Sequence, residues 1–158
     1  MNKLINLLRY IGFLPIAIAA MTITNTYSVL IQLKILQFID EKLYDTFIGR
    51  IIFIDLTNPI WQVFIYYSIY VLGGILGGLV YAYSGYFVAP NTSNNKKIPV
   101  SLLIGFIALI SLGVIIVNFT GITDVEGGGK IIFAKFMGYL IILIVSIKTL
   151  KKLQNEAT

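Results

Sequence analysis

Polar side chains interrupt the apolar N-terminal part of this sequence. Within one apolar stretch the chain reads TITNTYS, and Gln32 follows four residues later. A helix would place Asn25, Ser28 and Gln32 on one stripe, because residues three and four apart share a helix face. At bilayer depth such groups need partners. The stripe therefore either hydrogen-bonds to another helix or lines a solute or ion path, and the sequence leaves both interpretations open.

A single cation, Lys135, stands about one turn into an apolar segment near the C-terminus. A charge at the centre of a transmembrane helix costs roughly 2.5–3.5 kcal/mol. Lys135 can avoid this cost by extending to the membrane surface, toward Asp124 or Glu126. Alternatively, it lies inside the bundle against the polar stripe, where it would attract an anion or the polar end of a lipid.

These residues define a candidate polar pocket in the outer half of the membrane. It forms if the helices that carry them meet there. Its expected members are Asn25, Ser28, Gln32, Tyr66, Tyr70, Ser111 and Lys135.

The residues that most enzymes and metal sites use are missing or scattered. The chain contains no cysteine and no histidine, which removes thiolate and imidazole chemistry. The acidic residues are too dispersed to predict a metal site or an acid/base pair. The sequence EGGGKI lacks the spacing of a phosphate-binding loop. We therefore expect no catalytic residues, no metal, no cofactor and no enzymatic activity.

Composition indicates an integral membrane protein. Of the 158 residues 58% are hydrophobic and 12% are charged, about half the charged share of a soluble domain. Four apolar segments are long enough to cross ~30 Å of hydrocarbon. We expect an all-α, polytopic bundle of four transmembrane helices in a single domain, 1–158. The spans are expected at about 10–32, 60–88, 99–118 and 131–147, with outer loops 33–59 and 119–130 and inner loop 89–98.

The segment after the first span keeps a helical pattern while becoming more polar. Apolar residues recur at Leu36, Ile39, Leu43 and Phe47, with charged residues between them. This pattern predicts an amphipathic helix outside the cytoplasm, either continuing the first span or lying on the membrane surface. Within the first span, Pro15 is expected to introduce a kink.

The basic residues predict the orientation of the chain. Seven of the 12 lysines and arginines fall in the two terminal segments and loop 89–98, which hold Glu156 as their one acidic residue. Lysine and arginine are enriched on the cytoplasmic side of membrane proteins. We therefore expect both termini to be cytoplasmic. A multi-pass location in a bacterial plasma membrane is expected, and no stretch suits nucleic acid.

Small residues at helical spacing predict close helix packing. The second span contains VLGGILGG, and in lipid small residues let two helix backbones approach closely. The expected packing positions are Gly73, Gly74, Gly77, Gly78, Ala82, Gly105 and Gly138.

Two functions are compatible with this sequence. The first is a membrane subunit (a sensor, an anchor or a pore element) that forms a homo-oligomer or binds a protein partner through the glycine-rich second span. A bacterial defence or immunity system is one setting for such a subunit. The alternative is a small channel or carrier that uses the pocket around Asn25 and Lys135.

Overall fold

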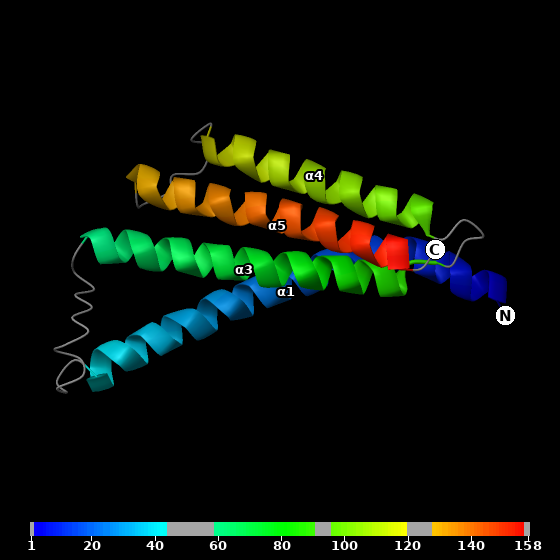
Figure 1. The fold of residues 1–158 in the computed structure, drawn as a ribbon. Helices are drawn as coiled ribbons and strands as arrows, with labels where there is room; N and C mark the ends of the chain where they lie inside the picture. The colour runs from blue at the N-terminus through cyan, green and yellow to red at the C-terminus, as the bar shows by residue number, and fades with distance from the viewer. Residues whose placement is uncertain (1, 44–58, 91–95, 120–127, 157–158) are drawn as a thin grey trace.

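The computed structural model describes residues 2–43, 59–90, 96–119 and 128–156. They form four helices: α1 (Asn2–Leu43), α3 (Pro59–Val88), α4 (Lys97–Phe119) and α5 (Gly128–Glu156). Each is long and apolar enough to cross a membrane. The described chain is therefore a polytopic helical membrane protein, and both of its ends lie at the same end of the bundle (Figure 1). We call this the terminal end and the opposite one the distal end.

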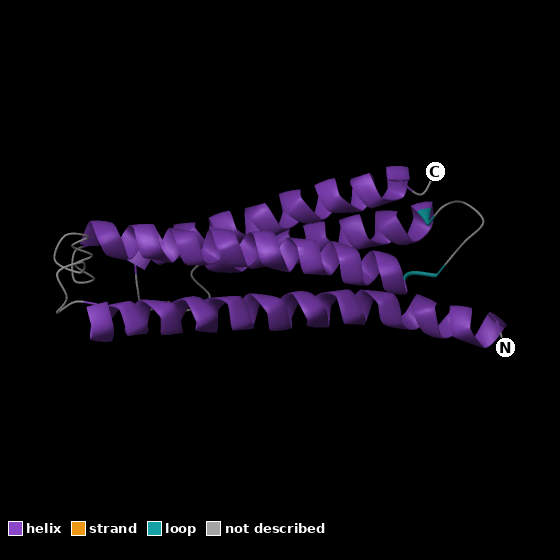
Figure 2. Cartoon of the chain, turned by 60° about the horizontal axis from the view of Figure 1, so that its bottom comes forward, coloured by secondary structure: helices purple, strands orange, loops and turns teal. Residues whose placement is uncertain are grey.

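Two helices extend beyond their expected spans. Helix α1 continues without a break from Asn2 to Leu43, because no glycine or proline follows Pro15 to stop it. The amphipathic segment is thus the end of α1 as far as Leu43, and its expected continuation at Phe47 lies outside the described residues. Helix α5 likewise runs past residue 147 to Glu156. Figure 2 shows the N-terminal part of α1 bending away from the rest, as expected from Pro15.

The helices are arranged around α3 and α5, which pack together along their length. Helix α1 lies against α3, and α4 lies mainly against α5. Toward the distal end α1 and α4 diverge on either side of this central pair (Figure 1). At this end a cavity opens between α1 and α4, and residues of the central pair line its floor.

Two glycines of α3 bring its backbone against α5. An ideal Cβ at Gly74 would lie 2.6 Å from the carbonyl oxygen of Gly138, and one at Gly78 would lie 2.9 Å from that of Ile142. No side chain fits at such distances. The buried hydroxyl of Ser146 also donates a hydrogen bond to the carbonyl of Gly78, at 3.2 Å. The contact is thus a backbone approach strengthened by one interhelical hydrogen bond.

The neighbouring glycines of α3 face α1. A Cβ at Gly73 would lie 2.7 Å from Oδ1 of Asn25, and one at Gly77 would lie 3.6 Å from Cγ of Met21. Nearer the terminal end, Ala82 is fully buried in the core. The glycine pairs of the second span are therefore both covered by helices of the same chain.

Helix α4 contacts α3 near the terminal end of the bundle. A Cβ at Gly85 would lie 2.6 Å from Cδ2 of Leu103 and 3.2 Å from Cβ of Ala17. The buried hydroxyl of Tyr81 donates a 2.9 Å hydrogen bond to the carbonyl of Leu103. Helices α1, α3 and α4 consequently meet around Gly85.

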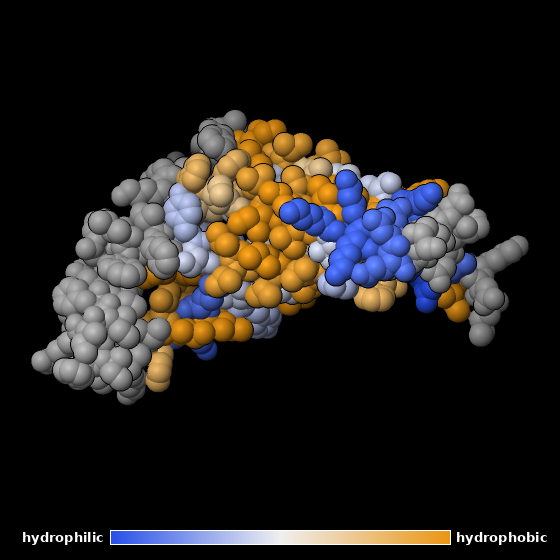
Figure 3. Space-filling view, in the orientation of Figure 1, coloured by the Kyte–Doolittle hydropathy of each residue, from blue (hydrophilic) through white to orange (hydrophobic). Residues whose placement is uncertain are grey.

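The Lys96 side chain caps the C-terminus of α3, at the terminal end of the bundle. The carbonyl of Tyr86 cannot accept the usual helical hydrogen bond, because Pro90, four residues on, has no N–H. The Lys96 ammonium donates to this carbonyl at 2.8 Å and lies 4.4 Å from the centre of the Tyr86 ring. Burial, followed by the charge of Arg9, lowers the pKa of Lys96. Figure 3 shows hydrophilic side chains gathered at this end, beside an apolar band.

Not every expected packing position is used. A Cβ added at Gly105 would meet nothing within 4 Å, and the same holds for Gly113. Both lie on an exposed face of α4. Gly105 therefore makes no close helix contact within the described chain, because α4 has its neighbours on its opposite side, and packing against a partner stays a prediction.

The glycine contacts lead to a stability prediction. Gly74→Ala should destabilise the protein by about 1–3 kcal/mol, the usual cost of overpacking, since its methyl group would meet the Gly138 carbonyl. The measurement is an unfolding titration of the purified protein in mild detergent. Gly113→Ala, at an open position of α4, is the matched control and should be neutral or slightly stabilising. Equal stability of Gly74→Ala and wild type would contradict the close α3–α5 approach.

Candidate functional site

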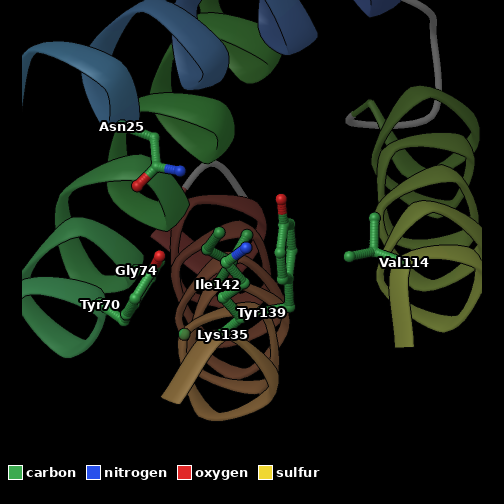
Figure 4. A pocket seen from close by; sticks show the side chains of 8 residues that line it. Asn25, Tyr70, Gly74, Val114, Lys135, Tyr139 and Ile142 are labelled. Atoms are coloured by element: carbon green, nitrogen blue, oxygen red, sulfur yellow. The ribbon is translucent and has the colours of Figure 1, made fainter. Parts of the chain in front are cut away.

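A cavity of about 180 Å³ lies in the opening between α1 and α4. Its lining residues come from all four helices and are Asn25, Tyr70, Gly74, Val114, Lys135, Gly138, Tyr139 and Ile142. Figure 4 shows the α1 and α3 residues on one side, Val114 of α4 on the other, and the α5 residues between them. The divergence of α1 and α4 thus creates the space, and the glycine contact between α3 and α5 forms part of its floor.

The Lys135 amino group points into this space. It lies among Asn25, Tyr70 and Tyr139 (Figure 4). The three neighbours come from different helices, so the site depends on the assembled bundle. Lys135 therefore lies on the inner side of α5, as the pocket interpretation of the sequence predicts.

Two of the polar groups in the cavity have no protein partner within the described parts of the chain. Neither the Asn25 amide nor the Lys135 ammonium forms a hydrogen bond or an ion pair there. Both side chains are half-buried. No aspartate or glutamate is among the lining residues. The cavity consequently has a positive charge and hydrogen-bonding groups available for a ligand.

The rest of the polar stripe forms interhelical contacts. The Gln32 amide nitrogen donates to the Ser28 hydroxyl at 3.0 Å and to the carbonyl of Ile69 on α3 at 3.5 Å. Ser28 itself is 8% exposed. The hydrogen-bonding interpretation therefore holds for Gln32, which joins α1 to α3, while Asn25 lies in the cavity lining.

Two further expected members lie outside the cavity lining. Tyr66 is exposed on the surface of α3. Ser111 is fully buried on α4, and its hydroxyl has no hydrogen-bond partner among the described residues. Of the seven residues expected in the pocket, the structure thus brings Asn25, Tyr70 and Lys135 together.

Three side chains that line the cavity were not expected from the sequence. Tyr139 lies one turn from Lys135, and its position on the same face of α5 could have indicated it. Val114 and Ile142 carry no such signal, because they are aliphatic residues in aliphatic segments. Their place in the lining follows from how α4 and α5 pack.

The fold and the cavity define the class of protein: a polytopic helical membrane protein with a partly polar intramembrane cavity. Comparison with protein families, with curated proteins and with solved structures finds no match for the chain. Its function therefore has to be inferred from its own geometry.

The unpaired charge leads to a second prediction. Lys135→Met should stabilise the protein by about 1–2 kcal/mol, less than the cost of a charge at a helix centre, because the cavity is open on one side. The same unfolding titration measures this change. Lys34→Met, which replaces an exposed lysine near the distal end of α1, is the control and should have little effect. A loss of stability in Lys135→Met would show that a carboxylate such as Asp124 or Glu126 neutralises the lysine.

Proposed function

We propose that this chain is a small, non-enzymatic membrane protein of the channel or carrier class that binds a polar, negatively charged solute in the cavity. The observation that carries this proposal is the Lys135 ammonium directed into a cavity beside Asn25. Lys135 has no counter-ion among the described residues, and an uncompensated charge is costly in the membrane. A bound anion would supply the missing charge and accept hydrogen bonds from the surrounding groups.

The membrane orientation is part of the proposal. The distribution of lysine and arginine supports cytoplasmic termini in a bacterial plasma membrane. In this orientation the cavity lies in the outer half of the bilayer, because Lys135 is near the distal start of α5. A solute would then reach it from the outer side.

A partner-binding membrane subunit remains the second candidate. Its expected contact, the glycine face of α3, is occupied by α1 and α5 of the same chain. One observation still favours association, namely the open positions of Gly105 and Gly113 on α4. A homo-oligomer or a protein partner, in a defence system or elsewhere, would then use α4 instead of α3.

The solute-binding proposal predicts a charge preference at the cavity. Since the chain has no cysteine, Val114→Cys places a single thiol in the lining. In nanodiscs this thiol should react with an anionic thiosulfonate reagent faster than with its cationic counterpart. Adding Lys135→Gln should lower this ratio of rates severalfold, because removing one positive charge slows the anionic reagent and speeds the cationic one.

The matched control is Leu109→Cys, because Leu109 is 68% exposed on the lipid side of the same helix. This thiol should react slowly with both charged reagents, since the hydrocarbon excludes them. Equal rates for Val114→Cys and Leu109→Cys would show that the cavity is closed to polar solutes. That result would contradict the proposed function and leave the partner-binding subunit as the remaining candidate.

A further inference from the structure

We infer that the cavity holds the phosphate group of an anionic membrane lipid, which enters sideways between α1 and α4. This inference rests on the proposed function and names the class of its ligand. It follows from the direction in which the cavity opens, the chemistry of its lining and its size.

The opening lies on the side of the bundle and widens toward the distal end, so that both a lipid and a water-soluble reagent have access to it. Helices α1 and α4 diverge toward the distal end (Figure 1), and the cavity lies between them. The lining itself includes the apolar side chains of Val114 and Ile142 beside its polar groups. A ligand in this opening meets polar groups on one side and lipid on the other. A lipid has this division, with a polar headgroup and apolar chains.

The lining favours a negative headgroup. Its polar groups are an ammonium, an amide and the phenols of Tyr70 and Tyr139. All of them can donate hydrogen bonds, while the ammonium has no acceptor capacity. A phosphodiester needs donors and one positive charge. A zwitterionic headgroup would bring a second cation close to Lys135, and the described lining residues include no carboxylate to receive it.

The cavity is the size of a headgroup. A volume of about 180 Å³ corresponds to roughly six water molecules at ~30 Å³ each. This space holds a phosphate with part of its ester but not the acyl chains, which would remain in the opening.

The test is protection of the Val114→Cys thiol in nanodiscs of different lipid composition. An uncharged, water-soluble thiol reagent avoids effects of the membrane surface charge. With Lys135 present, replacing phosphatidylcholine by phosphatidylglycerol should slow labelling by about tenfold, as expected at about ten times the Kd of the lipid. In Lys135→Gln the two lipids should give equal rates. Inorganic phosphate added to phosphatidylcholine nanodiscs should not protect.

A thiol at the exposed position 97 (Lys97→Cys) controls for general effects of the lipid and should react at the same rate in both membranes. Protection of Val114→Cys by inorganic phosphate, without protection by phosphatidylglycerol, would overturn the lipid inference and retain an anion site. No protection by either, with the thiol still reactive, would also overturn it. A thiol that is unreactive in every membrane would contradict the proposed function itself.

Discussion

The close approach of glycine backbones around α3 is the constraint on which the rest of this structure depends. Lipid chains are as apolar as leucine, so helices in a membrane gain little from burying apolar surface and associate through close packing instead. Gly74 and Gly78 face α5, whereas Gly73 and Gly77 face α1. With glycines on two adjacent faces, α3 packs backbone to backbone against α5 and makes room for the Met21 and Asn25 side chains of α1.

Helix α4 is held differently, and the cavity is a consequence. Its contact with α3 lies near the terminal end, where Leu103 packs on Gly85 and receives the hydrogen bond from Tyr81. Toward the distal end α4 diverges from α1 (Figure 1). The space between them has Lys135 in its lining. The glycine contacts therefore hold α1, α3 and α5 together, whereas α4 diverges from α1 and leaves room for a ligand.

The sequence predicted the helices well because hydropathy and helix-stop signals are local properties. The second span was expected at about 60–88 and α3 runs from Pro59 to Val88, and four apolar helices are present. Pairing of residues between helices could not be predicted, because it depends on how each helix is rotated. Gly105 and Gly138 each follow a small residue four positions earlier, yet of the two only Gly138 packs against a neighbouring helix, α3. Asn25 and Lys135 could be proposed for one pocket because they are polar residues in apolar segments, whereas Val114 carries no such signal.

Pulsed electron paramagnetic resonance in nanodiscs tests the central claim, the divergence of α1 and α4, most directly. The cysteine-free chain allows one spin-label pair near the terminal end, Ile16→Cys with Leu102→Cys, and one near the distal end, Ile31→Cys with Ile116→Cys. All four positions are exposed to lipid. The account predicts a clearly longer distance for the distal pair. Equal distances, or a shorter distal one, would mean that α1 and α4 run side by side and that no cavity exists between them.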